Sequence, residues 1–218
     1  MKIVCLGSGN VASHLTAAFK GAGMEIVQVW SRNLSHADTL AASLNTQAIA
    51  DLKLVDKNAD LYLIAVKDDA IKDVAFSLFG VQGLVVHTSG ATSIDVLKGL
   101  AQYGVLYPLQ TFSKHKDLNL SGTPFCLEAS SEEGFNLMQQ LGSAIGAAIY
   151  RIDSEQRKIL HLAAVFACNF SNHLYHLANT VLASNNLKFD LLRPLIMETA
   201  LKVQHDVPIK VQTGPAVR

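Results

Sequence analysis

Residues 1–12 read MKIVCLGSGNVA and contain the strongest structural signal in the chain. Ile3–Leu6 is a short apolar run that includes β-branched residues, and it predicts a strand. The residues after it follow the pattern Gly-x-Gly-x-x-Ala, and the sequence from Asn10 to Lys20 then has the pattern of a helix. A strand, this turn and a helix in direct succession predict a dinucleotide-binding βαβ unit.

Each small residue of this turn has its own expected role. Gly7 permits the tight turn, Gly9 lets the backbone approach a pyrophosphate, and Ala12 allows the helix to pack closely on the strand. The helix N-terminus adds unpaired N–H groups and a partial positive charge. The expected pyrophosphate contacts are the backbone N–H groups of Ser8, Asn10 and Val11.

Composition narrows the classes of protein to consider. The chain has 218 residues, of which 50% are hydrophobic and 17% charged, and this indicates a well-buried globular protein. Eighteen basic and eighteen acidic residues give a formal net charge of zero. Nucleic-acid and membrane-surface binding usually need a basic field, so we expect neither partner.

The cysteines and the apolar segments indicate the compartment. Cys5, Cys126 and Cys168 show no paired spacing, which suits a reducing cytosol better than a disulfide framework. The chain begins almost at once with a predicted strand, so we expect no signal peptide. Residues 159–182 are apolar but contain His161, Asn169, Asn172, His173 and His176, and a membrane span would not normally tolerate so many polar groups. We therefore expect a cytoplasmic protein.

Strand and helix patterns alternate through the first two thirds of the chain. After the first βαβ segment, strands are expected at 25–30, 47–50, 61–66, 84–87, 104–107, 125–128 and 148–152. Helices are expected at 35–44, 70–78, 93–102 and 132–145, with a helical turn at 52–56. This alternation predicts an α/β fold with a doubly wound, mainly parallel Rossmann sheet.

The pattern changes at Asp153. No turn signal interrupts residues 154–184, and a further helix is expected from Asp190 to about His205, ended by Pro208. The sequence therefore predicts two domains, a Rossmann NADP-binding domain at 1–152 and an all-helical domain at 153–218.

The end of the second strand predicts the choice of cofactor. An NAD-preferring site has Asp or Glu there to bind the ribose 2′-hydroxyl, whereas residues 30–33 read WSRN and contain no acid. The hydroxyl of Ser31 and the guanidinium of Arg32 suit the 2′-phosphate of NADP, although Arg32 could also be a solvated surface residue. We expect NADP rather than NAD.

Two further loops follow strands and so belong at the carboxyl edge of the sheet, where ligands bind. In AVKDDAI (65–71), Val66 and Lys67 are expected to contact the cofactor. In HTSGA (87–91), Thr88 and Ser89 are expected to border the nicotinamide or substrate. His87 is equally compatible with a site role and with a structural one. Residues 107–112, YPLQTF, are a candidate for the other wall of the cleft.

The long helical run carries an unusual polar stripe. At 100° per residue its members fall within an arc of about 80°: Lys158, His161, Val165, Asn169, Asn172 and His176. Facing the nicotinamide cleft, Lys158 or His161 would handle a proton and Asn169 would orient the substrate. The alternative is a polar seam between helices of a dimer. A metal site at His161, His173 and His176 is disfavoured, because His173 lies off the stripe and no carboxylate joins it, so no metal is expected.

Several of these segments together resemble a known family. GSGNVA, WSRN, AVKDDAI, HTSGA, YPLQTF and KILHLAAVFACNFSNHLY are similar to a bacterial family of NADP oxidoreductases that joins a Rossmann-like domain to a helical domain of unknown function. That family is related to pyrroline-5-carboxylate reductase, ketopantoate reductase, prephenate dehydrogenase and the β-hydroxyacid dehydrogenases. The resemblance covers essentially the whole chain.

The resemblance implies further properties. It implies a homodimer through the helical domain, which would also close a substrate cleft over the nicotinamide. A Lys and an Asn that act in the β-hydroxyacid branch would correspond to Lys158 and to Asn169 or Asn172. In the family, helices continue beyond a motif like TGPAVR (213–218), where this chain ends.

We therefore predict an NADP(H)-dependent oxidoreductase. It would transfer a hydride to or from the C=O/CH–OH or C=N/CH–NH unit of a small polar metabolite, and the cofactor would supply the redox chemistry. The alternative is a non-catalytic NADP sensor, in which cofactor binding shifts a dimer or partner interface. The sequence names no substrate.

Overall fold

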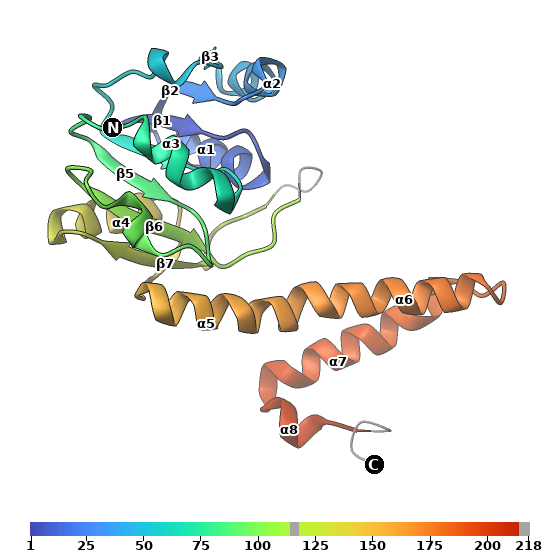
Figure 1. Ribbon diagram of the computed structural model, residues 1–218. Helices are drawn as coiled ribbons and strands as arrows, with labels where there is room; N and C mark the ends of the chain where they lie inside the picture. Colours follow the sequence, from blue (N-terminus) through green and yellow to red (C-terminus); the bar gives the residue numbers. More distant parts are fainter. Residues whose placement is uncertain (114–117, 214–218) are drawn as a thin grey trace. The chain divides into compact units, whose positions relative to one another are not determined.

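The computed structural model describes residues 1–113 and 118–213 (Figure 1). The chain forms two compact units, Met1–Ala164 and Val165–Arg218, and each is described by itself. Residues 214–218 of the TGPAVR motif lie outside the described residues.

An eight-stranded sheet forms the centre of the first unit, in the order β3-β2-β1-β4-β5-β6-β7-β8. Neighbouring strands are parallel except for the antiparallel pair β6 and β7. The strands are β1 (Lys2–Leu6), β2 (Glu25–Trp30), β3 (Gln47–Ile49), β4 (Leu61–Ile64), β5 (Leu84–His87), β6 (Tyr103–Pro108), β7 (Pro124–Ala129) and β8 (Ala148–Arg151). The predicted α/β fold with a mainly parallel sheet is confirmed.

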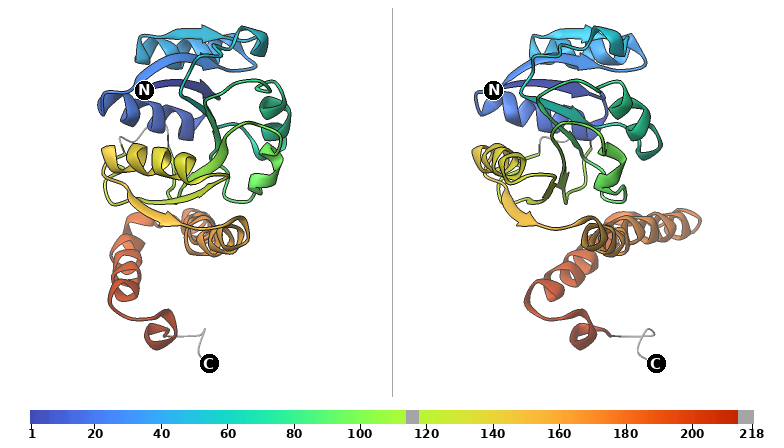
Figure 2. Two further views of the ribbon diagram at one scale, coloured as in Figure 1. Left: turned by 90° about the vertical axis from the view of Figure 1, so that its left-hand side faces the viewer. Right: turned by 60° about the vertical axis from the view of Figure 1, so that its left-hand side comes forward.

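Helices cover both faces of this sheet. They are α1 (Asn10–Gly21), α2 (Leu34–Leu44), α3 (Ile71–Phe76), α4 (Glu132–Ala144) and α5 (Ser154–Ala164), with 3₁₀ turns η1 (Leu52–Leu54), η2 (Asp68–Ala70) and η3 (Ile94–Leu97). Two apolar layers result: α1, α2 and α4 pack on one face, and α3 packs with η3 on the other (Figure 2).

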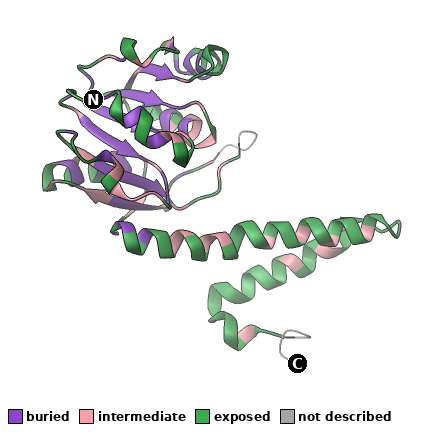
Figure 3. Ribbon diagram, viewed as in Figure 1, coloured by how far each residue is buried: buried purple, intermediate pink, exposed green. Residues whose placement is uncertain are grey.

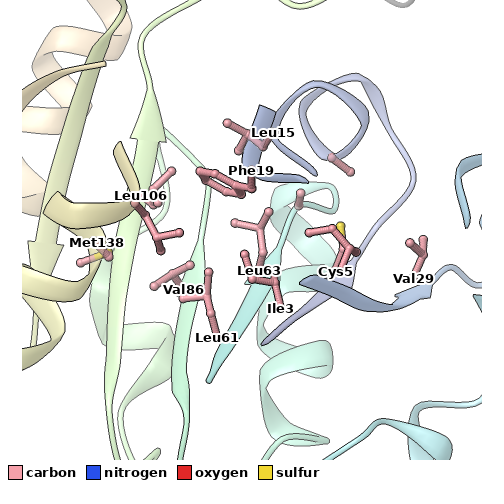
Figure 4. Close-up of a cluster of buried hydrophobic side chains, with 14 of the residues drawn as sticks. Ile3, Cys5, Leu15, Phe19, Val29, Leu61, Leu63, Val86, Leu106 and Met138 are labelled. Atoms are coloured by element: carbon pink, nitrogen blue, oxygen red, sulfur yellow. The ribbon is translucent and has the colours of Figure 1, made fainter. Parts of the chain in front are cut away.

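The central strands are almost entirely apolar because helices bury both of their faces. Every residue of β4 and β5 is buried. On the α1 side, Leu15 and Phe19 pack over Ile3, Leu63 and Val86 from three neighbouring strands (Figure 4). The sheet is therefore a rigid platform for the loops at its carboxyl edge.

The strand order places a crevice at that edge. The chain leaves β1 toward β2 and β3 and then returns to β4 on the other side of β1. At such a switch point the loops after neighbouring strands diverge and leave room for a ligand. The Gly7 N–H donates to the Trp30 carbonyl and the Ala65 N–H to the Leu6 carbonyl, both at 2.8 Å, so the ends of β1, β2 and β4 are held together.

The predicted helix at 93–102 is wrong. Only Ile94–Leu97 is helical, as a single 3₁₀ segment, and Gly99 then turns the chain with φ of +99°. The Ile94 N–H donates to Ser154 Oγ at 3.0 Å, so a contact far along the chain fixes the start of this segment. Helix α2 starts at Leu34, one residue earlier than predicted, and the Asn33 side chain caps it by accepting from the Ser35 N–H.

The predicted domain boundary after Ile152 does not coincide with the division between the compact units. Helix α5 belongs to the first unit, where Ser154 and Arg157 are buried. Their side chains bond to Glu128 of β7 and to the loop after β5, and these contacts extend the first unit to Ala164.

The second unit is entirely helical. It contains a π-helical segment, η4 (Val165–Phe170), followed by α6 (Ser171–Ala183), the 3₁₀ turn η5 (Phe189–Leu192), α7 (Arg193–His205) and α8 (Pro208–Val211). No described residue of this unit is buried (Figure 3). A π-helical segment changes the angle per residue, so the predicted 80° stripe does not hold beyond Val165.

Candidate functional site

A cavity of about 450 Å³ lies at the carboxyl edge of the sheet, at the switch point between β1 and β4. Its walls come from the turn after β1, the end of β2 and the start of α2, and the loops after β4 and β5. The lining residues are Gly7, Ser8, Gly9, Asn10, Val11, Trp30, Ser31, Arg32, His36, Ala65, Val66, Lys67, Ala70 and Thr88.

The two glycines of the first turn are required for different reasons. Gly7 has φ of +133°, and a Cβ there would lie 2.1 Å from the Ala65 carbonyl oxygen. Only glycine fits, because both the backbone conformation and the neighbouring strand exclude a side chain. A Cβ at Gly9 would meet nothing within 4 Å. Gly9 therefore keeps space open at the cavity and is not required by contacts within the protein.

The N-terminus of α1 is arranged to receive an anion. Gly9 is the N-cap and provides no side-chain cap, and the first turn contains no acidic residue. The Asn10 side chain is held away from this terminus, since its Nδ2 donates to the Phe112 carbonyl at 2.9 Å. The N–H groups that begin the helix are thus free to bind phosphate oxygens, with the helix dipole in their favour.

The ionisable side chains that line the cavity are all of basic residue types. Arg32, His36 and Lys67 line it, and no Asp or Glu does. Trp30, which is 5% exposed, is fixed by its indole N–H, which donates to the Ala50 carbonyl at 2.9 Å. A carboxylate at the end of β2 is the usual partner of an unphosphorylated ribose, and its place here is taken by Ser31 and Arg32.

The cavity brings together all of the predicted cofactor residues except Ser89. Ser89 is buried, and its hydroxyl oxygen accepts from the N–H groups of Ala91 and Thr92 at 3.1 and 3.0 Å, so it shapes the loop after β5. Sequence reasoning missed Trp30, His36, Ala65 and Ala70 as lining residues. Trp30 precedes Ser31 and Ala65 precedes Val66, and both Ser31 and Val66 were predicted contacts. This proximity in sequence could have identified Trp30 and Ala65 as lining residues.

A second group of side chains lies beside the loop that contributes Thr88. The Tyr107 hydroxyl at the end of β6 is 3.0 Å from His161 Nδ1 on α5, and the two rings meet edge to face with centroids 5.8 Å apart. A Cβ at Gly90 would lie 2.6 Å from His161 Nδ1. Burial raises the pKa of Tyr107 to about 12. The structure thus places His161 beside the loop after β5, at the carboxyl edge of the sheet.

The other two predicted catalytic residues are placed differently. Lys158 is exposed on α5 and its ammonium group pairs with Glu155 at 2.8 Å. It lines none of the described cavities. Asn169 is an exposed residue of η4 in the second unit.

Helix α5 is anchored by Arg157, whose side chain is completely buried. Its Nη1 donates to Glu128 Oε2 at 2.5 Å, and its Nη2 donates to the Thr92 carbonyl at 2.7 Å and to Ser154 Oγ at 3.0 Å. Ser154 in turn donates to the same Glu128 oxygen at 2.8 Å. Arg157 therefore ties α5 to β7 and to the loop after β5, one turn before His161.

His87 has a structural environment. It is fully buried, and its Nδ1 accepts from the Ser89 N–H at 3.2 Å. Burial, with the nearby Arg157 charge, lowers its pKa to about 3. His87 is thus neutral at physiological pH and does not line the cavity, so the structural alternative from the sequence is favoured.

The second unit has a separate cavity of about 860 Å³ between α6 and α7. It is lined by Asn172, Tyr175, His176, Asn179, Phe189, Arg193, Ile196, Met197 and Ala200. In the described part of the chain, no three His, Cys, Asp or Glu side chains are grouped to hold a metal ion. None of the helices described is both long enough and apolar enough to cross a membrane.

Comparison with known proteins gives two family matches. Residues 2–91 match the family described as "NADP oxidoreductase coenzyme F420-dependent", and residues 123–218 match a domain of unknown function, DUF2520. No curated protein matches the chain.

Several solved structures are similar over nearly the whole chain. A putative NADP oxidoreductase from Bacteroides fragilis is 42% identical, with a TM-score of 0.94 over 100% of this chain and 85% of that one. A protein from Thermotoga maritima is 25% identical, with a TM-score of 0.73 over 98% and 83% of the two chains. A 1-pyrroline-5-carboxylate reductase from Streptococcus pyogenes shares the fold at 15% identity, with a TM-score of 0.71 over 99% and 82%.

Proposed function

This chain belongs to the same family as the Bacteroides fragilis oxidoreductase, and we propose that it binds NADP(H) and transfers a hydride to or from a small polar substrate. The family and the fold show a nicotinamide-dependent oxidoreductase. The choice of NADP over NAD, the residues that act, and the class of substrate are the proposal.

The cavity fits a dinucleotide. Gly7 shapes the turn, Gly9 leaves open space at the uncapped start of α1, and Ser8, Asn10 and Val11 supply backbone N–H groups for the pyrophosphate. Val66, Lys67 and Thr88 extend the lining along the carboxyl edge from β4 to β5, toward the place proposed for the nicotinamide. The Ser89 hydroxyl accepts a hydrogen bond inside this loop, so Ser89 is not included among the proposed cofactor contacts.

The observation that supports NADP is the charge around the cavity. Arg32 and Lys67 line it without any carboxylate, so a 2′-phosphate would meet two cations and no like charge. We assign the 2′-phosphate to Ser31 and Arg32, since a guanidinium can grip a phosphate with two charge-assisted hydrogen bonds.

Bound NADPH supplies a hydride with its electron pair, and a C=O or C=N group that accepts the hydride at carbon takes up one proton at oxygen or nitrogen. His161 is the proposed source of that proton, because it is partly exposed at the carboxyl edge and bonded to Tyr107. In the oxidation direction the same ring would accept the proton. Lys158 remains a proposed second proton carrier, and Asn169 a proposed substrate contact.

Titration calorimetry with NADPH and with NADH tests the cofactor assignment. We expect NADPH to bind more tightly, and Arg32→Ala to weaken NADPH binding by about 10- to 100-fold, the loss of one charged hydrogen-bonding group. NADH binding should change little. Arg151→Ala is the matched control, because Arg151 is also exposed in the first unit and does not line the cavity. Equal affinities for the two cofactors in the unaltered protein would refute the NADP assignment.

We also propose that the helical unit forms a homodimer, as the family resemblance implies. Large apolar side chains are exposed along both of its long helices, among them Leu174 at 62% on α6 and Leu195 at 63% on α7. A helical unit in which no described residue is buried needs a further surface to stabilise it. A second copy of the chain is the proposed partner.

Sedimentation tests the dimer. The unaltered protein should sediment as a dimer, and a charge in the middle of the apolar surface, as in Leu174→Asp, should give monomers. Leu54→Asp is the control, because Leu54 is also 62% exposed but lies in the first unit. A monomeric unaltered protein at micromolar concentration would refute this proposal.

The exposed thiol of Cys168 is typical of a reducing compartment, and we propose a cytoplasmic location.

A further inference from the structure

The Tyr107 hydroxyl has one described hydrogen-bond partner, and that partner is a histidine nitrogen. Tyr107 is 9% exposed and belongs to an apolar cluster with Val105 and Cys126. Its only hydrogen bond to a described residue is the one to His161 Nδ1, at 3.0 Å. A buried phenol O–H without an acceptor costs free energy, so the hydroxyl donates and Nδ1 accepts.

This direction of donation determines where the neutral imidazole carries its proton. If Nδ1 accepts from Tyr107, the ring hydrogen must be on Nε2. No described residue forms a hydrogen bond with Nε2, and His161 is partly exposed. The ring therefore presents an N–H donor, rather than a lone pair, on the side away from Tyr107.

The surrounding backbone leaves room for this close approach. A Cβ at Gly90 would lie 2.6 Å from His161 Nδ1 and 2.9 Å from Tyr107 Cζ, so the pair fits only against a glycine. Gly90 follows Thr88, which lines the cofactor cavity, by two residues. Arg157 precedes His161 by four residues, hence on the same face of α5, and its bond to the Thr92 carbonyl holds the helix against this loop.

We propose that Tyr107 is a positioning residue that holds His161 as its Nε2–H tautomer, so that Nε2–H donates to the C=O or C=N group being reduced. This inference rests on the proposed hydride transfer. As the hydride and its electron pair reach carbon, the substrate oxygen or nitrogen takes the Nε2 proton. His161 Nδ1 then takes the hydroxyl proton of Tyr107, and water returns a proton to the phenolate. The net uptake is one hydride and one proton by the substrate.

The resting state agrees with this sequence of steps. Burial keeps Tyr107 protonated, with a pKa of about 12, so the phenol is available as a donor throughout the physiological range. The phenolate would exist only after the substrate has taken a proton.

Nitrogen-15 NMR of the histidine rings tests the assignment on the full-length protein. His161→Gln identifies the His161 resonances. At a pH where His161 is neutral, we expect the shift of a protonated Nε2 and of an unprotonated, hydrogen-bonded Nδ1. In Tyr107→Phe, Nδ1 should move toward the shift of a protonated nitrogen as the other tautomer becomes populated. Tyr103→Phe, a change on the same strand, is the control and should leave His161 unaltered.

A protonated Nδ1 in the unaltered protein, or identical His161 shifts with and without the Tyr107 hydroxyl, would overturn the proposal. Addition of NADPH gives an independent readout: we expect the His161 Nε2 resonance to move on saturation. If calorimetry detects NADPH binding and this resonance does not move, the proton-donor role is refuted. If NADPH does not bind, the proposed function fails and the proton-donor role with it, while the tautomer measurement still decides whether Tyr107 fixes the ring.

Discussion

Replacing Arg157 with Met removes the charged anchor of α5 while keeping most of the side chain's apolar length. In the native protein Arg157 is completely buried and its partner Glu128 has a side chain that is 18% exposed. The substitution leaves Glu128 without its cation and the Thr92 carbonyl without its donor. Breaking a buried pair on one side costs about 3–5 kcal/mol, because the remaining charge stays poorly solvated. We expect Arg157→Met to lower the free energy of unfolding by that amount.

Urea unfolding followed by tryptophan fluorescence measures this loss directly. Trp30 is the only tryptophan of the chain and is 5% exposed in the first unit, so its emission reports the unit that contains Arg157. Arg151→Met is the matched control. Arg151 also pairs with a glutamate in this unit, but the pair with Glu132 is exposed, with side chains 57% and 68% accessible. We expect a much smaller change there.

A double substitution separates the orphaned charge from lost packing. Adding Glu128→Gln to Arg157→Met removes the uncompensated carboxylate, so the double variant should be more stable than Arg157→Met alone. A loss below about 1 kcal/mol in Arg157→Met would refute the anchoring role, since a buried guanidinium with three hydrogen bonds cannot be that dispensable.

Three further outcomes are expected. Gly7→Ala should destabilise the fold by more than about 3 kcal/mol, since a positive φ alone costs about 1–3 kcal/mol and the new Cβ meets the Ala65 carbonyl; a thermal melt within a few degrees of the unaltered protein would contradict this. Burial lowers the pKa of His87 to about 3, whereas its pKa in the unfolded chain is 6.5. Between these two values only the unfolded state binds the proton, so the free energy of unfolding should fall by about 1.4 kcal/mol for each pH unit below 6.5. Urea unfolding of His87→Gln between pH 6 and 4.5 should show no such dependence of the free energy of unfolding on pH. The same dependence in the variant and in the unaltered protein would refute this role of His87. Burial raises the pKa of Cys5 to about 12, so in a Cys126→Ser, Cys168→Ser background Cys5 should react with a thiol reagent only after unfolding, and rapid labelling of the native protein would count against its burial.

The sequence was informative about the cofactor cavity because the residues that form it are local. Gly7, Gly9 and the WSRN segment lie at strand ends, and strand ends in a parallel sheet meet at one edge. The ends of β2 and β5 were predicted to the residue. Ser89 follows Thr88, which lines the cavity, but the Ser89 hydroxyl accepts hydrogen bonds inside the loop, and the sequence does not reveal this difference.

The features that the sequence did not predict depend on distant partners. Arg157 stands between Gln156 and Lys158, and nothing local distinguishes the buried cation from the exposed one. The distinction comes from Glu128 on β7, which meets Arg157 and not Lys158. The same holds for residues 93–102, where a helical pattern was overridden by Ser154 at one end and by the conformation of Gly99 at the other.

The regular angle assumed for the long helical run also failed for a structural reason. The π-helical segment at Val165–Phe170 adds backbone between hydrogen-bonded partners, and apolar periodicity alone does not reveal it. Lys158 and His161, which precede it, keep their predicted relation on α5. The predicted polar stripe placed Asn169 on the same face as these two residues only because it assumed an uninterrupted α-helix.

The contrast between Gly7 and Gly9 has an evolutionary consequence. A side chain at position 7 collides with the Ala65 backbone, whereas one at position 9 extends into space that no protein atom occupies. A related protein that no longer binds the cofactor but keeps the sheet would therefore still require glycine at position 7, whereas position 9 could accept other residues. Substitutions at position 9 with glycine retained at position 7 would therefore indicate relatives that keep this fold but have lost cofactor binding.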